Sequence, residues 1–111
     1  MTDQLTMQAL QQRVDDYIGQ FKEGYFPPFE LLARLTEELG ELSREVQDVY
    51  GQKKKKSTED TNSIEEELGD FLFVLVCFAN AQGIKLDEAL LRVIHKFETR
   101  DKDRWTRKDE E

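Results

Sequence analysis

The sequence has almost none of the sulfur and imidazole side chains that many metal sites use. It contains one cysteine, Cys77, and one histidine, His95. A single cysteine excludes an internal disulfide and a cage of thiolate ligands, because both need several sulfur atoms, and it fits a reducing compartment. Cys77 has apolar neighbours and His95 has no catalytic partner nearby in the sequence, so we interpret both as packing residues.

Long hydrophobic runs are also missing. The longest apolar run covers only residues 71–79, whereas a membrane-spanning helix needs roughly 20 residues. The first ten residues have neither a basic leader nor the apolar segment of a signal peptide. We therefore expect a soluble, cytoplasmic protein that is neither secreted nor embedded in a membrane.

Charge is abundant, and its sign is acidic. The 111 residues (13.1 kDa) contain 24 Asp and Glu against 16 Lys and Arg, a net charge of −8. Such a field repels nucleic acids, which disfavours a simple DNA-binding domain. The length predicts one domain over residues 1–111. With 38% hydrophobic residues, that domain has a modest core, so we expect it to form oligomers.

Two prolines and six glycines separate segments whose apolar residues recur at helical spacing. The pattern predicts an all-α four-helix bundle. The expected helices cover residues 6–21, 28–50, 64–82 and 86–100. Residues 51–62 include four adjacent lysines and no apolar side chain, which predicts a flexible loop, and residues 101–111 form a mostly polar tail.

The apolar spacing also predicts which side of each helix is buried. On the second helix the steps of three and four form a packing seam made of Leu32, Leu35, Leu39, Leu42, Val46 and Val49. The third helix is apolar on every side over residues 71–79, which indicates several neighbours, including another subunit. On the fourth helix we expect four residues to face inward: Leu90, Val93, Ile94 and Phe97.

Two helices carry the same pair of carboxylates. Glu38 and Glu41 are three residues apart on the second helix, and Glu67 and Asp70 are three apart on the third. This spacing places each pair on one helix face, and Glu37 borders the first pair. Like charges at this spacing destabilise a helix, so something must offset their repulsion.

A divalent cation offsets such repulsion directly. Oxygen ligands without His or Cys favour Mg²⁺ or Mn²⁺ over zinc, and a di-iron bundle would need Glu-x-x-His pairs. The alternative is that these acidic residues belong to solvated helix faces. Gly40 and Gly69 occupy equivalent places in the two strings E-E-L-G-E-L and E-E-L-G-D-F. Because glycine is unfavourable inside a helix, their presence predicts a close approach of helices.

The compound pattern E-E-x-x-E at 37–41 followed by E-x-x-D at 67–70 resembles the signature of the MazG-type, all-α nucleoside triphosphate pyrophosphohydrolases. Similar strings extend the resemblance over roughly residues 20–105: G-Y-F-P-P-F-E-L-L-A-R-L at 24–35, G-I-x-L-x-E-A-L at 83–90 and K-F-x-x-R at 96–100. One departure is Lys85, where relatives often have an acidic helix cap.

The resemblance implies hydrolysis of a nucleoside triphosphate to the monophosphate and pyrophosphate. It implies Mg²⁺, with Mn²⁺ as a substitute, held by Glu38, Glu41, Glu67 and Asp70. We expect Glu37 and Glu38 to be catalytic, with Glu37 orienting or deprotonating the attacking water or adding a metal contact. Two further residues, Lys96 and Arg100, are expected to hold the outer phosphates.

Several alternatives stay open. Within the same superfamily the substrate could be phosphoribosyl-ATP, dUTP or dCTP instead of a noncanonical nucleotide cleared by housecleaning. A different class is a non-catalytic helical module that binds metal and forms oligomers. We expect a homodimer or homotetramer with sites completed across subunits. Tyr25, Phe26 and Phe29 around the two prolines either plug the end of the bundle or stack on a base.

Overall fold

The computed structural model describes residues 4–51 and 63–109. They form four α-helices: α1 (Met7–Ile18), α2 (Pro28–Tyr50), α3 (Ile64–Ala81) and α4 (Leu86–Thr99). The all-α prediction is confirmed, and each helix begins within one residue of its expected start. The helix α1 ends three residues early, at Ile18, because Gly19 follows it. The predicted loop falls almost entirely on residues 52–62, outside the described residues.

Local side-chain chemistry explains two of these starts. The Thr6 hydroxyl accepts a hydrogen bond from the backbone N–H of Ala9 at 3.0 Å, and the Ser63 hydroxyl accepts one from Glu66 at 3.0 Å. These bonds satisfy N–H groups that have no partner inside the helix. Gly83 ends the turn after α3 with a φ of +70°, a conformation that glycine adopts without a steric penalty.

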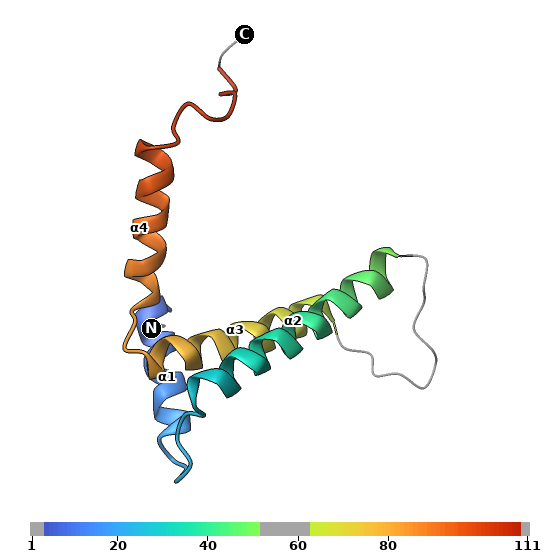
Figure 1. Ribbon diagram of the computed structural model, residues 1–111, viewed down its shortest axis with the longest axis vertical. Helices are drawn as coiled ribbons and strands as arrows, with labels where there is room; N and C mark the ends of the chain where they lie inside the picture. Colours follow the sequence, from blue (N-terminus) through green and yellow to red (C-terminus); the bar gives the residue numbers. More distant parts are fainter. Residues whose placement is uncertain (1–3, 52–62, 110–111) are drawn as a thin grey trace.

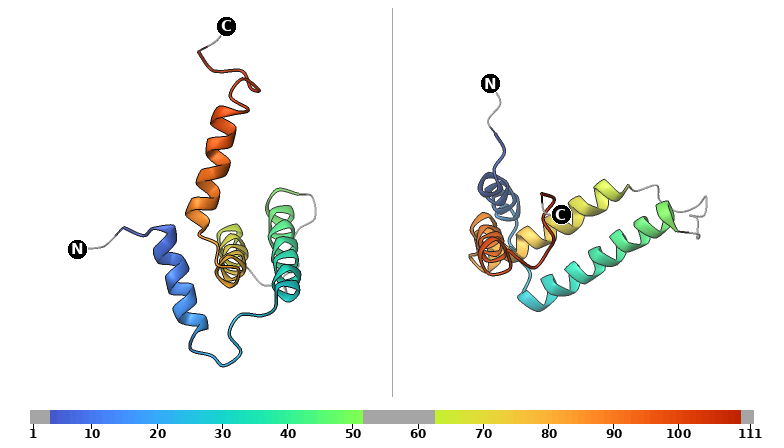
Figure 2. Two further views of the ribbon diagram at one scale, coloured as in Figure 1. Left: turned by 60° about the vertical axis from the view of Figure 1, so that its left-hand side comes forward. Right: turned by 90° about the horizontal axis from the view of Figure 1, so that it is seen from above.

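The helices α2 and α3 form a long hairpin, and α1 lies across one end of it (Figures 1 and 2). A small core fills the junction, where Leu31, Val74 and Cys77 are buried against Val14 and Ile18. The rest of the hairpin is covered by no other described helix. The apolar interior therefore lies at the α1 end, while the middle of the hairpin depends on contacts between α2 and α3 alone.

The buried side of α2 is not the side that the leucine spacing predicted. The least exposed positions follow one another at steps of three and four, and they include carboxylates: Leu31, Leu35, Glu38, Leu42, Glu45 and Asp48. Four of the six predicted seam residues are exposed in the single chain: Leu32, Leu39, Val46 and Val49. The acidic side of α2 faces α3, which leaves this apolar edge uncovered.

The helix α4 does not join a bundle. It makes an angle of 99° with α3 and projects away from the hairpin (Figure 1), and none of its residues is buried. The prediction of a four-helix bundle is therefore wrong for the single chain, in which three helices pack together and the fourth extends. The four residues expected to face inward are all exposed: Leu90, Val93, Ile94 and Phe97.

The two repeated glycines do not mark a close approach of helices in the single chain. A Cβ atom built on Gly40 or Gly69 would meet nothing within 4 Å. The prediction from their helix positions is wrong for the single chain, because both glycines lie on exposed edges of the hairpin.

One glutamine determines where α4 begins. The Gln11 amide donates to Asn80 Oδ1 and to the Ile84 carbonyl, both at 2.9 Å, and its Oε1 accepts from the Leu86 N–H at 2.9 Å. Lys85 stands at the N-cap and forms no side-chain cap bond. A side chain of α1 therefore supplies the cap of α4, which joins three helices at one polar point.

Among the described residues, no single helix has the length and apolar character needed to cross a membrane. Only α3 and α4 taken together, as a pair bent by 99°, have sufficient length and apolar composition.

Replacing Gln11 by alanine tests this junction. The substitution removes three hydrogen bonds and leaves partly buried partners unpaired, so we expect Gln11→Ala to lower the free energy of unfolding by about 2 kcal/mol. Gln12→Ala is the matched control, because the Gln12 amide bonds only to Asp16 on the exposed surface of α1. Urea denaturation of both variants measures the difference, and equal stability would contradict the assignment.

Candidate metal centre

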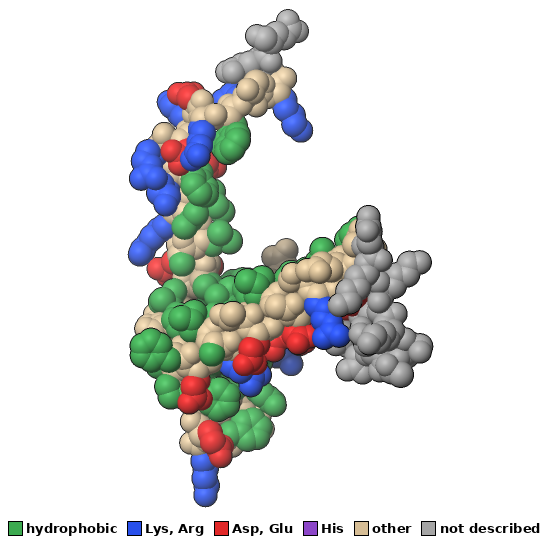
Figure 3. Space-filling view, turned by 45° about the vertical axis from the view of Figure 1, so that its right-hand side comes forward, with side chains coloured by type: hydrophobic (Ala, Val, Ile, Leu, Met, Phe, Trp, Pro, Cys, Tyr) green, Lys and Arg blue, Asp and Glu red, His purple; other side chains and the backbone are tan. Residues whose placement is uncertain are grey.

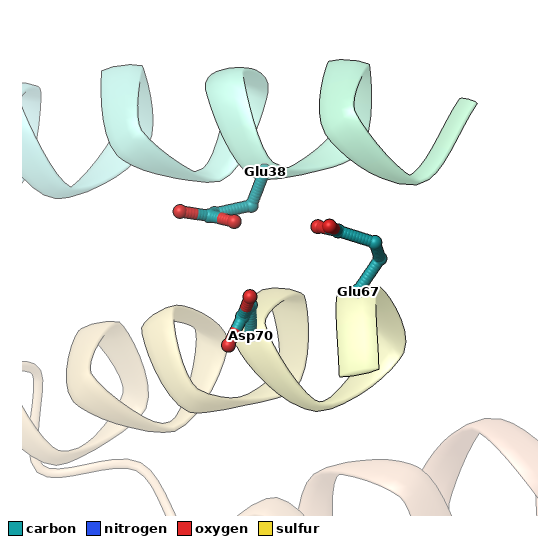
Figure 4. Close-up of side chains that lie close together, drawn as sticks. All are labelled: Glu38, Glu67 and Asp70. Carbon is teal, nitrogen blue, oxygen red and sulfur yellow. The ribbon is translucent and has the colours of Figure 1, made fainter. Parts of the chain in front are cut away.

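Three carboxylates meet across the α2–α3 interface. Glu38 comes from α2, while Glu67 and Asp70 come from successive turns of α3, and one oxygen of each lies within 4.8 Å of the others. Figure 4 shows the side chains pointing toward one another between the two helices. We call these three residues the acidic triad.

Burial varies steeply across the triad. The Glu67 residue is only 4% exposed, Glu38 is half-buried, and Asp70 is open to solvent. Burial raises the pKa of Glu38 above its ordinary value, and the negative charge of Asp70 raises it further. Arg34 partly opposes this shift, while Glu67 and Glu41 add to it. The triad thus has a buried side and an open side.

The donor set fits a hard divalent cation. Every donor is a carboxylate oxygen, the ligand type that Mg²⁺ and Mn²⁺ prefer. Two oxygens bound to one Mg²⁺ lie at most about 4.2 Å apart, so a small side-chain rotation brings the triad into range. The exposed side at Asp70 leaves room for water and for a further ligand.

The other predicted site residues on α2 lie beside the triad. Glu41 follows Glu38 by one turn and is exposed; it is outside the group of three, although its charge raises the pKa of Glu38. Glu37 is also exposed. Their roles as fourth ligand and as water-orienting group stay predictions.

The two predicted phosphate-binding residues do not reach the triad within one chain. Lys96 belongs to α4 and Arg100 caps its C-terminal end, the end that points away from the hairpin (Figure 1). The Lys96 ammonium lies 5.6 Å from the centre of the Phe97 ring, and Arg100 Nε lies 3.9 Å from Asp101 Oδ1. Both side chains interact with residues of their own segment.

Acidic residues that do not belong to the motif also lie at the interface. Glu45 is buried, and Asp48 has a carboxylate oxygen that is buried without a hydrogen-bond partner among the described residues. The spacing Glu38, Glu41, Glu45 and Asp48 follows helical steps of three and four. That periodicity is the sequence signal for an acidic face on α2. The leucines of the same helix show a similar periodicity, which favours the adjacent face.

Substitution of Glu38 tests the electrostatics of the triad. Because the folded-state pKa of Glu38 is raised, its contribution to stability is present at low pH and is lost as the pH rises through that value. We expect Glu38→Gln, without metal, to be more stable than wild type at pH 7.5 and to lose this advantage near pH 4. Urea denaturation in EDTA measures this.

Mg²⁺ should reverse the order of stability, so that wild type becomes more stable than Glu38→Gln. At a concentration 100 times its dissociation constant, a ligand that binds only the folded state adds about 2.7 kcal/mol, and Glu38→Gln should gain much less. Glu23→Gln, in the exposed turn after α1, is the control and should behave as wild type. A wild-type stability that does not respond to Mg²⁺ would contradict the metal assignment.

Comparison with known proteins identifies the family. The model of the MazG nucleotide pyrophosphohydrolase domain matches residues 26–105. The uncharacterized protein YpjD of Bacillus subtilis is 68% identical over 105 residues, which cover 95% of each chain. The crystal structure of YpjD, a candidate pyrophosphatase, matches 89% of this chain and 100% of its own with a TM-score of 0.79 and 64% identity.

A second crystal structure is that of the Bacillus-conserved MazG protein, a nucleotide pyrophosphohydrolase. It is 54% identical, with a TM-score of 0.78, and the match covers 92% of this chain and 99% of that one. The matched residues 26–105 include the whole acidic triad. The chain therefore belongs to the MazG nucleotide pyrophosphohydrolases, a family of hydrolases.

Proposed function

We propose that this protein hydrolyses a nucleoside triphosphate to the nucleoside monophosphate and pyrophosphate, and that it needs Mg²⁺, with Mn²⁺ as a substitute. The observation that carries this proposal is the acidic triad, which joins α2 and α3 inside the segment matched by the family. A triphosphate cannot approach such a cluster unaided, because both are negative.

Each carboxylate has a role in this proposal. Glu38, Glu67 and Asp70 hold the metal, and Glu41, one turn further along α2, is the fourth ligand. Mg²⁺ bound there supplies charge neutralisation of the phosphates and of the transition state. Glu37 orients or deprotonates the attacking water from the exposed side of α2.

A homo-oligomer explains the apolar surface that the single chain leaves open. The single chain has a radius of gyration of 18.2 Å, whereas a compact chain of this length has one of about 13 Å. Apolar side chains line the side of α4 that faces the hairpin, and basic ones line its opposite side (Figure 3). A groove of about 300 Å³ between α1 and α3 is also apolar. We propose that a second copy covers these surfaces, in a homodimer or a homotetramer.

The proposed assembly also gives Lys96 and Arg100 a role at the acidic triad of another subunit. Because α4 directs them away from the triad of their own chain, we propose that they bind the outer phosphates at the triad of a neighbouring subunit. Guanidinium binds phosphate through two parallel hydrogen bonds, and ammonium binds it as a point charge.

The proposed biological role is the removal of noncanonical nucleotides in the cytoplasm, where the buried, unpaired Cys77 is compatible with a reducing medium. Phosphoribosyl-ATP, dUTP and dCTP are the alternative substrates, since the same carboxylates serve any of them.

Product analysis tests the reaction. With Mg²⁺ we expect equal amounts of monophosphate and pyrophosphate, and none with EDTA. Asp70→Asn should lower kcat/KM at least about 100-fold, whereas Glu65→Gln, an exposed carboxylate of the first turn of α3, should retain activity. In oxygen-18 water, label in the monophosphate identifies attack at the α-phosphorus. No turnover of any nucleotide by the folded, metal-bound protein would contradict the proposal.

Light scattering and subunit mixing test the assembly. Phe97→Asp on the apolar side of α4 should lower the mass to that of a monomer, whereas Arg92→Gln, on the opposite side, should not. Glu38→Gln and Arg100→Ala should each be inactive alone, and exchange of their subunits should restore hydrolysis. Hybrids that form but remain inactive would contradict the sharing of sites.

A further inference from the structure

A chain of hydrogen bonds extends from the Gln11 junction to the turn before α2. Asn80, near the C-terminal end of α3, accepts from the Gln11 side chain and donates to the Gln11 backbone carbonyl, both at 2.9 Å. Its amide also donates to the Tyr25 hydroxyl at 3.0 Å, and this hydroxyl donates to Asp15 on α1 at 2.6 Å. We call Gln11, Asp15, Tyr25 and Asn80 the polar network. It links α1, α3, the turn before α2 and the start of α4.

The two side-chain amides of the polar network use all their hydrogens. Gln11 donates to Asn80 and to the Ile84 carbonyl, and Asn80 donates to the Gln11 carbonyl and to Tyr25. Burial and the bond to Asp15 raise the pKa of Tyr25 to about 12, so its hydroxyl keeps its proton and its bond to Asp15 at neutral pH. A polar network paired in this way favours one arrangement of the elements that it joins.

The polar network fixes the direction of α4 as well as its starting point. The planar amide of Gln11 holds the chain at two places, because it donates to the Ile84 carbonyl and accepts from the Leu86 N–H. A single bond would leave α4 free to pivot, whereas two bonds to one planar group define an orientation. None of the α4 residues is buried, so packing within the single chain adds little to this constraint.

The length of α4 amplifies any change of direction at its start. Arg100 follows Leu86 by 14 residues, which is about 21 Å along a helix. A rotation of about 10° at Leu86 therefore moves Arg100 by about 4 Å, more than the length of a hydrogen bond. Lys96, ten residues after Leu86, moves by about 3 Å. A contact made at the far end of α4 (Figure 1) thus depends on the bonds at its near end.

We propose, on the basis of the function proposed above, that Gln11 is a positioning residue for the substrate. By fixing the direction of α4 it places Lys96 and Arg100 against the outer phosphates at the triad of a neighbouring subunit. Gln11 acts through α4, and Asn80 holds its amide in the required orientation. In a symmetric assembly every subunit holds α4 in the same direction, so the polar network sets all the sites. The effect is large because misplacing a binding group by about 1 Å costs about 100-fold in rate.

Calorimetry with two probes tests this proposal. Mg²⁺ alone reports on the triad, whereas inorganic tripolyphosphate in excess Mg²⁺ also reports on the contacts of Lys96 and Arg100. Gln11→Met keeps the length of the side chain and removes its hydrogen bonds. We expect it to weaken tripolyphosphate binding at least about tenfold and to leave Mg²⁺ binding unchanged. Gln12→Ala, which removes an amide that bonds to Asp16 on the exposed side of α1, should change neither.

Two further variants show whether Gln11 acts through the end of α4. When Lys96 and Arg100 are both replaced by alanine, the phosphate contacts are already absent, so adding Gln11→Met should weaken tripolyphosphate binding by less than about twofold. Tyr25→Phe removes the far end of the polar network and leaves both bonds from Gln11 to the start of α4. It should therefore weaken tripolyphosphate binding less than Gln11→Met does. Circular dichroism verifies that each variant is folded.

The outcomes separate this proposal from the one on which it rests. Equal losses of Mg²⁺ and tripolyphosphate binding in Gln11→Met would show that the polar network only supports the fold, and would overturn the positioning role. Unchanged tripolyphosphate binding, or a tenfold loss that persists without Lys96 and Arg100, would overturn it as well. If replacing Lys96 and Arg100 alone leaves tripolyphosphate binding intact, the proposed phosphate contact is wrong and the positioning role falls with it. Hydrolysis is assayed separately, so absent turnover counts against the proposed function alone.

Discussion

The rest of the structure depends on one constraint, the placement of carboxylates at the α2–α3 interface. Two helices pack along a face on which Glu38 and Glu67 take positions that apolar residues usually occupy, and Glu45 continues the same face. Burying charged groups is costly, and the apolar core is confined to the α1 end of the hairpin. The cation proposed at the triad would therefore contribute to the packing of α2 on α3 as well as to chemistry.

The same constraint explains the uncovered surfaces. Because the acidic side of α2 faces α3, the apolar edge at Leu39 and Val46 is left at the outside of the hairpin. The polar junction at Gln11 then directs α4 away from this hairpin, so α4 covers none of it. A single chain thus has a small core and much exposed apolar surface, which is the physical basis for the proposed second copy.

The sequence by itself determined the four helices and the two carboxylate pairs, because helix periodicity is a local property. It also determined the family, because E-E-x-x-E and E-x-x-D are local strings. Local strings do not reveal which of two adjacent helix faces a single chain buries, so most of the leucine seam of α2 and the predicted inward side of α4 are exposed in the single chain. Only the tertiary structure decided which faces are buried, because a chain with few helices can cover only some of its apolar surfaces. It was the packing of α2 on α3 that brought Glu38 to Glu67 and Asp70, and the Gln11 junction that placed Lys96 and Arg100 far from them.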